Sequence, residues 1–230
     1  MNKVAAQWKA SFLQLRIYLI CIVGLIAASY ISQFIVTLSI GPGDSGGMPV
    51  STSNILTVFL IFVATVLPAA YFKRIISFGA TRKEYFIGLL AIYAVWSAFF
   101  SLLNAIWYFA ETRWLKTTGD LYFNIIEIFG WDRFGFLGIL LYQFVVYMLL
   151  LSLLSLLFSG LRSWIGWALW AALAAAIPVG TSIPSLRVHL ADGFLALLFN
   201  DSLLQGLGWN VLFACLFLAG GWWLTKRRTF

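Results

Sequence analysis

The stretch FGFLGILLYQFVVYMLLLSLLSLLF, residues 134–158, carries no charged side chain and decides the fold class. A helix rises about 1.5 Å per residue, so a run of this length crosses a hydrocarbon core of roughly 30 Å. Five more apolar runs of spanning length lie at 17–38, 54–72, 86–109, 163–180 and 206–224. The sequence therefore predicts an all-α integral membrane protein, with six transmembrane helices in a single domain over residues 1–230.

Composition supports the same class. Of the 230 residues, 62% are hydrophobic, 18% are aromatic and only 10% are charged. A soluble domain would have too little polar surface to cover that apolar area. The first apolar run follows a basic segment and lacks a small-residue cleavage site, so we expect a retained helix rather than a removed signal peptide.

The basic residues predict the topology. If the N-terminus is cytoplasmic and six spans alternate, the cytoplasmic segments hold eleven Lys and Arg with one acid, Glu84, and the outer segments hold four Lys and Arg with seven acids. Because cytoplasmic loops are enriched in Lys and Arg, both termini are predicted to lie in the cytoplasm of a cell-membrane protein. Topology alone thus accounts for the net charge of +7, and no nucleic-acid partner is needed.

Two segments outside the spans have alternative interpretations. Residues 1–16 place Val4, Trp8, Phe12 and Leu15 on one stripe, which favours an interfacial helix in the headgroup plane. The alternative is a fraying cytoplasmic extension of the first helix. In the outer loop 110–133, Trp114 and Trp131 are expected to mark the membrane interface, as Trp8 and Phe12 do on the other side.

A second irregular segment precedes the last span. Pro178 and Pro184 are expected to break the fifth helix, and Asp192, Asn200 and Asp201 interrupt the apolar residues that follow. Irregular backbone at membrane depth survives only when it is buried in protein or lines a cavity. We therefore expect 185–205 to form a broken outer hairpin, either re-entrant or lying on the surface, with an ordinary outer loop as the alternative.

No catalytic or metal-binding pattern emerges. His189 is the only histidine, Cys21 and Cys215 lie in different spans, and no spacing of His, Cys or carboxylates resembles a metal site. The glycines of 41–54 lack the Lys-Ser/Thr of a phosphate loop. The chain is therefore not expected to be an enzyme or to hold a cofactor. No ionisable residue lies in the middle of a span, so any driving energy should enter from outside the membrane.

The longest cytoplasmic loop between spans contains SFGATRKEYF, residues 77–86. Gly79 can end a short helix, and Thr81 can cap a new helix from Arg82, with Glu84 completing a capping box. A short amphipathic helix over 73–85 that displays Arg and Lys would suit the docking of another protein.

These residues resemble the membrane subunit of type-2 ATP-binding-cassette transporters, above all the small six-helix permeases of Gram-positive bacteria. Many of those carry Ser-x-Gly-x-Ser/Thr-Arg, a basic residue and an aromatic between their second and third helices. This chain has Ser77, Gly79, Thr81, Arg82 and Lys83, followed by Tyr85 and Phe86. The interfacial N-terminal helix, the six spans and the broken outer hairpin extend the resemblance over the whole chain.

The resemblance implies a permease of an ATP-driven exporter that works by alternating access. Its segment 73–85 would be a coupling helix docking on a cytoplasmic ATPase, which would hold the ATP and Mg²⁺. Six spans form half of such a translocator, so a homodimer or a heterodimer with a second permease is implied, in contact with membrane lipid. The residues that would contact the ATPase are Ser77, Gly79, Thr81, Arg82, Lys83 and Glu84.

The substrate is less defined. Permeases of this build often export amphipathic or antimicrobial peptides, and the acid-rich outer segments, net −3 by the seven acids and four bases counted above, favour cationic molecules. No substrate-binding residue can be named. The alternative function is a non-transporting membrane module, either an assembly factor or a sensor, whose loop 73–84 recruits a cytoplasmic partner.

Overall fold

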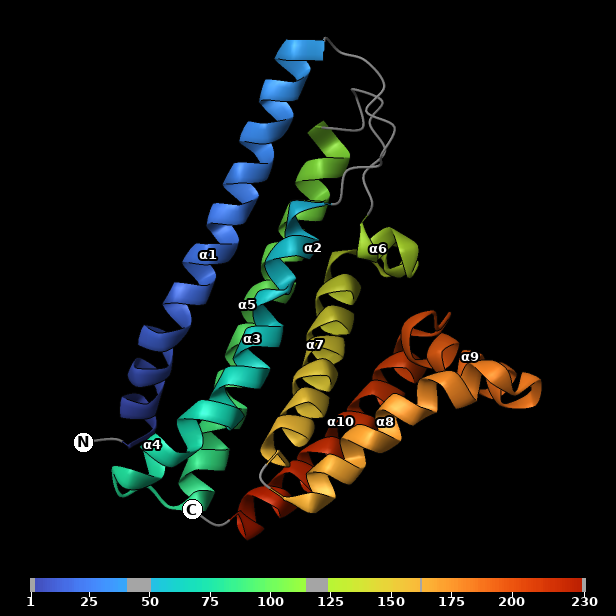
Figure 1. Ribbon diagram of the computed structural model, residues 1–230. Coiled ribbons are helices and arrows are strands. Elements are labelled where there is room, and N and C mark those ends of the chain that lie inside the picture. Colours follow the sequence, from blue (N-terminus) through green and yellow to red (C-terminus); the bar gives the residue numbers. More distant parts are fainter. Residues whose placement is uncertain (1–2, 41–50, 115–123, 162, 229–230) are drawn as a thin grey trace.

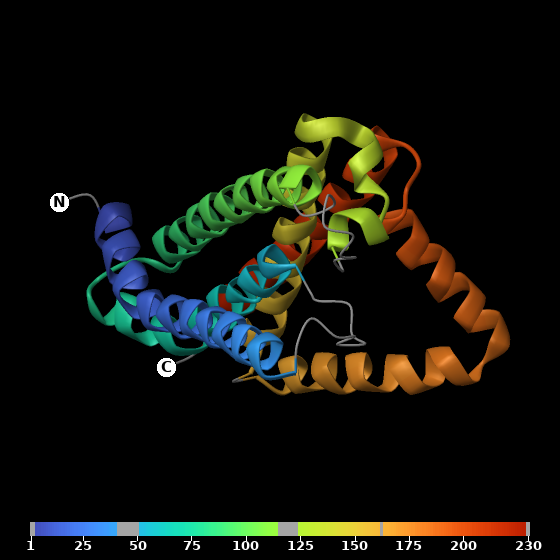
Figure 2. The ribbon, with the colours of Figure 1, turned by 90° about the horizontal axis from the view of Figure 1, so that it is seen from above.

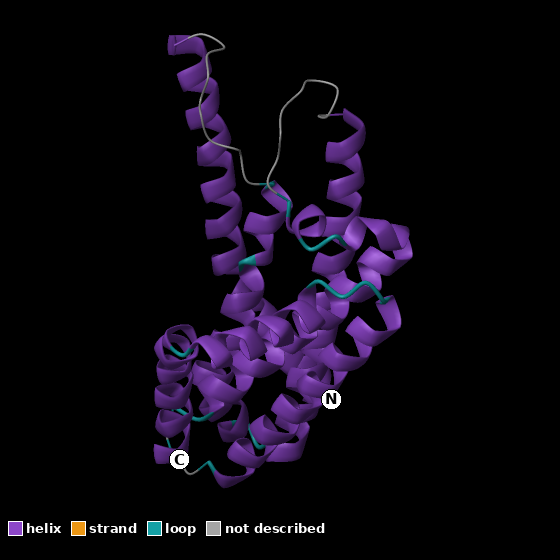
Figure 3. Ribbon diagram, turned by 90° about the vertical axis from the view of Figure 1, so that its right-hand side faces the viewer, coloured by secondary structure: helices purple, strands orange, loops and turns teal. Residues whose placement is uncertain are grey.

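A computed structural model describes residues 3–40, 51–114, 124–161 and 163–228. Within these ranges the chain forms helices and short connections, without a strand (Figure 3). The elements in chain order are α1 (Lys3–Ile40), α2 (Thr52–Thr57), α3 (Phe59–Val66), the π-helix η1 (Leu67–Tyr71), α4 (Phe72–Ser77), α5 (Arg82–Trp114), α6 (Ile125–Ile128), the 3₁₀-helix η3 (Trp131–Phe134), α7 (Gly135–Ser159), α8 (Trp164–Ser182), α9 (Pro184–Leu198) and α10 (Leu203–Arg227).

Six helical stretches of the described residues are long and apolar enough to cross a membrane, which confirms the predicted number of spans. They are Gln7–Ser32, Asn54–Ser77, Arg82–Arg113, Trp131–Ser159, Trp164–Ser182 and Leu203–Arg227. The chain is therefore a multi-pass membrane protein. Each span lies within a few residues of its predicted position except the first, which begins ten residues before the predicted 17–38.

The first span begins early because α1 is one continuous helix. No break separates residues 3–16 from the rest of α1, so the structure does not show a separate interfacial helix. Among the side chains of this segment that the structure describes, Gln7, Ser11 and Leu15 are buried. Of the predicted stripe only Leu15 is among them, while Trp8 is partly buried and Phe12 is exposed. Contacts with other helices, and not lipid alone, therefore set which face of this segment is covered.

The second span is broken where the sequence predicted one helix. It consists of α2, α3, η1 and α4, and Pro68 lies in the π-helical turn η1. Proline has no N–H and its ring clashes with the carbonyl four residues earlier, and a wider π turn is one way a helix absorbs that conflict. The span thus has an irregular segment just before its basic end.

Two clusters of buried side chains hold the spans together. One joins α1, α3, η1, α4, α5 and α7 and contains Leu15, Leu60, Tyr71, Tyr85 and Tyr93. The other joins α5, α6, η3 and α7, with Trp131 and Tyr142 at its centre. Helix α7 also packs along α10 and α5. Because lipid tails are as apolar as these side chains, close packing rather than exclusion from water holds such helices together.

Helices α8 and α9 reach away from the other spans (Figure 2). Pro184 starts α9, but Pro178 lies inside α8, which continues to Ser182. The expectation that Pro178 breaks this helix was therefore wrong; its ring costs a hydrogen bond without ending the helix, as occurs in membranes. Residues 185–205 are also not a broken hairpin by themselves: they comprise most of α9, a turn and the start of α10.

The start of α1, the α4–α5 turn, the α7–α8 turn and the end of α10 all lie at one end of the bundle (Figure 1). We call it the basic end, since its described residues include Lys9, Lys73, Arg74, Arg82, Lys83, Lys226, Arg227 and Arg228. We call the opposite end, with α6, η3 and the start of α10, the acidic end; its described acids include Glu111, Glu127, Asp132 and Asp201.

Candidate partner-docking site

The turn between α4 and α5 has a defined hydrogen-bond pattern. Gly79 has a φ of 81°, its N–H donates to the carbonyl of Ile76 at 3.0 Å, and the N–H of Ala80 donates to the carbonyl of Ile75 at 3.4 Å. These two bonds form a Schellman motif, which ends a helix with a left-handed residue. The predicted role of Gly79 in ending a short helix is confirmed.

The next residues begin α5 with a complete capping box. The N–H of Thr81 donates to Oε2 of Glu84 at 2.7 Å, and the N–H of Glu84 donates to Oγ1 of Thr81 at 3.2 Å. The Thr81 hydroxyl also donates to the same carboxylate oxygen at 3.0 Å. This reciprocal arrangement satisfies two N–H groups that a helix start leaves free. The cap makes the direction of α5 at its first turn well defined.

The predicted site residues therefore have two different roles: some shape the turn and others present charge. Gly79, Thr81 and Glu84 shape the turn, and Ser77 closes α4 by donating to the carbonyl of Arg74 at 2.7 Å. Only Arg82 and Lys83 remain to present charge. The predicted succession of a short helix, a sharp turn and a new helix from Arg82 is confirmed: α4, residues 78–81 and the first turn of α5 follow one another, so the segment 73–85 is not one continuous helix.

Contacts with α1 hold this turn in place. Nε2 of Gln7 donates to the carbonyl of Tyr85 at 3.2 Å, and the Tyr71 hydroxyl donates to the carbonyl of Ala10 at 2.6 Å. The hydroxyl of Tyr85 reaches the carbonyl of Leu67 in η1 at 3.2 Å. The start of α1 is thus bonded to elements on both sides of the turn.

The end of α10 makes a second set of contacts. The Arg82 guanidinium donates to the carbonyl of Lys226. Arg228 is buried; it donates to the carbonyl of Pro68 at 2.7 Å, and its guanidinium carbon lies 4.5 Å from the centroid of the Phe72 ring. Both ends of the described chain therefore bind the segment on which the docking prediction depends.

The outer face of the turn is basic with one large apolar side chain. Phe78 is 79% exposed, and Lys73, Arg74 and Lys83 of the same segment are exposed as well. Phe78 was not among the site residues predicted from the sequence. The signal that could have found it is local: Phe78 is a large apolar residue directly before the glycine that was predicted to end the helix.

The four residues predicted to mark the membrane interface have different environments. Phe12 is half exposed and stacks on Trp96 at 6.4 Å between ring centroids, and Trp8 is partly buried against the core. Trp131 is buried and donates from Nε1 to the carbonyl of Leu198 at 2.8 Å, so its ring faces protein. Trp114 ends α5, and its side chain lies outside what the structure describes.

Two amide side chains inside the described spans join helices. Nδ2 of Asn104 donates to the Tyr147 hydroxyl at 3.0 Å, between α5 and α7. Nδ2 of Asn210 reaches the carbonyl of Leu197 at 2.8 Å. In the described residues no group of three or more His, Cys, Asp or Glu is placed to hold a metal ion. The basic end is the clearest candidate for a functional surface.

Comparison with other proteins adds no family assignment: no family model, curated protein or solved structure matches this chain.

Proposed function

We propose that this chain is the membrane-spanning permease of an ATP-driven exporter and that a separate cytoplasmic ATPase docks on its α4–α5 turn. The observation that carries the proposal is the shape of that turn. A Schellman motif and a capping box present Phe78 and Lys83 outward. An exposed aromatic side chain with exposed cations near it in the sequence suits the centre of a protein interface, since aromatic residues supply much of the binding energy there.

The contacts behind the turn supply a route for coupling. A force on Phe78 and Lys83 would reach α1 and α10. The carbonyl of Tyr85 accepts a hydrogen bond from α1, and the guanidinium of Arg82 donates one to α10. The π-helical turn η1 lies directly above α4 and gives the second span a place to bend. Closure of the ATPase would thereby move three spans together.

The rest of the proposal follows from the number of spans and their charges. Six spans would pair with a second copy or a similar permease to enclose a pathway. With the basic end in the cytoplasm, the acidic end faces outward, which favours cationic amphiphiles, including amphipathic or antimicrobial peptides. ATP and Mg²⁺ would be bound by the ATPase, and this chain would supply no catalytic group.

The test is capture of the ATPase by the tagged chain, purified from its own cells in mild detergent, with quantitative mass spectrometry. The variant Phe78→Ser/Lys83→Glu changes exposed side chains and leaves every turn hydrogen bond in place. We expect recovery of a Walker-motif ATPase to fall at least about tenfold, as for loss of an interface hot spot.

A matched control is Lys9→Glu, which reverses one exposed charge at the same end, on α1. It should capture the ATPase as well as the native chain does. Equal capture by native and double-variant chains would refute docking at this turn. Capture of a different cytoplasmic protein, lost in the double variant, would instead favour a recruiting module that does not transport.

A further inference from the structure

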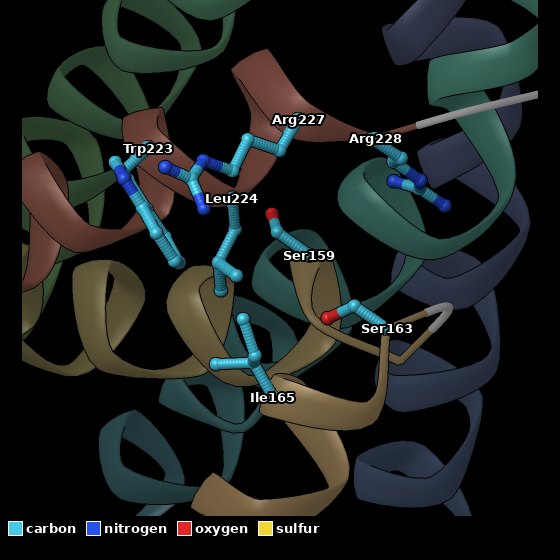
Figure 4. Close-up of a pocket in the computed structure, with 7 residues that line it drawn as sticks. All are labelled: Ser159, Ser163, Ile165, Trp223, Leu224, Arg227 and Arg228. Carbon is cyan, nitrogen blue, oxygen red and sulfur yellow. The ribbon is translucent and has the colours of Figure 1, made fainter.

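A small cavity opens at the basic end, between the α7–α8 turn and the end of α10. It has a volume of about 80 Å³, well above the roughly 10–15 Å³ that a single water needs. Ser159 and Ser163 line it from one side and Trp223, Leu224 and Arg227 from the other (Figure 4). The proposed docking turn does not contribute to it.

The hydroxyl of Ser159 faces this cavity. Ser159 is only 5% exposed, and its hydroxyl makes no hydrogen bond with any residue that the structure describes; Figure 4 shows it turned toward α10, on the side of Leu224 and Arg227. The hydroxyl is therefore available to a polar ligand in the cavity.

The N-terminus of α8 adds to this arrangement. Ser163 caps the helix by accepting from the N–H of Gly166 at 3.2 Å, which leaves the N–H groups of the first two helical residues, Trp164 and Ile165, without intrahelical partners. Ile165 lines the cavity. The positive end of a helix dipole and free N–H groups together favour an anion.

Arg227 supplies the positive charge. Its guanidinium carbon lies 4.1 Å from the centroid of the Trp223 ring, and in the described ranges it forms no ion pair. Arg228 also borders the cavity, but its guanidinium turns the other way, toward η1 and α4 (Figure 4). A planar guanidinium with a hydroxyl and backbone N–H groups matches the oxygens of a phosphate.

The surrounding side chains indicate where such a phosphate comes from. Trp164 and Trp167 on α8 are mostly exposed, and Trp223 is partly so. Tryptophan at the ends of spans lies at headgroup depth, and basic residues there attract anionic lipids. We propose that this cavity binds the phosphate of an anionic phospholipid headgroup in the leaflet at the basic end. The inference does not depend on the proposed transport function.

The test is titration of the detergent-purified chain with phosphatidylglycerol, followed by native mass spectrometry. Arg227→Gln should weaken binding about tenfold or more, and Ser159→Ala by roughly two- to tenfold, in line with charged and neutral hydrogen bonds. Without lipid, Ser159→Ala should melt at the native temperature, since its hydroxyl bonds nothing in the lipid-free protein.

Lys226→Gln is the matched control: it removes the same charge from the adjacent residue, whose side chain does not line the cavity. If Lys226→Gln and Arg227→Gln weaken binding equally, the attraction is diffuse and the site is refuted. Displacement of the lipid by millimolar inorganic phosphate would assign the cavity to a free phosphate and overturn the lipid as its occupant.

Discussion

At the residue scale, Gly79 shows how one position fixes the shape of the candidate site. A Cβ added there would meet no atom within 4 Å, yet its φ is 81°. The requirement for glycine is therefore conformational and not steric. Other L-residues pay roughly 1–2 kcal/mol in the left-handed region, with Asn the most tolerant.

We predict that Gly79→Ala weakens the α4–α5 turn by about 1 kcal/mol and that Gly79→Asn weakens it less. Amide hydrogen exchange at Ala80, which donates to Ile75, measures the change directly. Gly24→Ala is the matched control, since Gly24 also has open space around it but no positive φ. Unchanged exchange at Ala80 in Gly79→Ala would contradict the role given to this glycine.

Glu111 is a second residue whose side chain connects several elements. It is buried near the acidic end of α5. Its carboxylate accepts from the Ser51 hydroxyl at 2.8 Å, from Nε1 of Trp107 at 2.6 Å and from Nδ2 of Asn124 at 3.3 Å. Asn124 in turn caps α6. One carboxylate thus joins the start of α2, the end of α5 and the start of α6.

We predict that Glu111→Gln lowers thermal stability in detergent by about 1–3 kcal/mol, because an amide NH₂ in place of a carboxylate oxygen would face the donor-only groups Nε1 of Trp107 or Nδ2 of Asn124. Asp192→Asn, at an exposed position on α9, should leave the melting temperature unchanged. A native melting temperature for Glu111→Gln would show that these bonds contribute nothing net.

At the element scale, the second span and the end of α10 act on each other. The π-helical turn η1 contains Pro68, whose carbonyl receives Arg228, and the carbonyl of Leu67 receives the Tyr85 hydroxyl. An irregular helical turn is weaker than an α-helical one, so side-chain donors from other elements stabilise it. The contact makes the C-terminal residues part of the bend.

We predict that Arg228→Ala increases amide exchange across residues 67–77 and lowers stability by about 1.5–3 kcal/mol, the range for a hydrogen bond from a charged group. Arg227→Ala, the neighbouring change, should do neither, because that side chain contacts Trp223 and not η1. Equal exchange in the two variants would contradict the proposed support of the bend.

At this scale, the local hydrogen bonds of the candidate site could be predicted from the sequence, and its contacts with distant segments could not. Thr81, Glu84 and Gly79 act on partners at most four residues away, so their motif could be recognised from spacing. Arg82 and Arg228 act on Lys226 and Pro68, which are far away in the sequence. No local pattern announces such contacts.

At the scale of the whole molecule, the six spans separate a basic end from an acidic end. The start of α1 and the end of α10 share the basic end (Figure 1). By the bias of Lys and Arg toward the cytoplasm, that end should lie inside the cell.

We predict that, in intact cells, a membrane-impermeant maleimide labels Ser202→Cys, while Lys83→Cys reacts only after permeabilisation. Both positions are exposed, so a difference in labelling between the two cysteines reports the side of the membrane on which each one lies. Cys21 and Cys215 are also exposed in the isolated chain, and each is first replaced by alanine. Labelling of Lys83→Cys from outside would reverse the topology and remove the basis for a cytoplasmic partner at this turn.

The sequence by itself determined the class of protein, the number of spans, and the local shape of the α4–α5 turn. Spanning length, apolar runs and capping patterns are properties of neighbouring residues, so they can be recognised without a fold. Only the tertiary structure decided that α1 is continuous, that Pro68 falls in a π turn, that Trp131 is buried, and that the chain ends bind the turn. Those features depend on which distant side chains pack together, and in a chain this apolar throughout, hydropathy does not distinguish a face that meets protein from one that meets lipid.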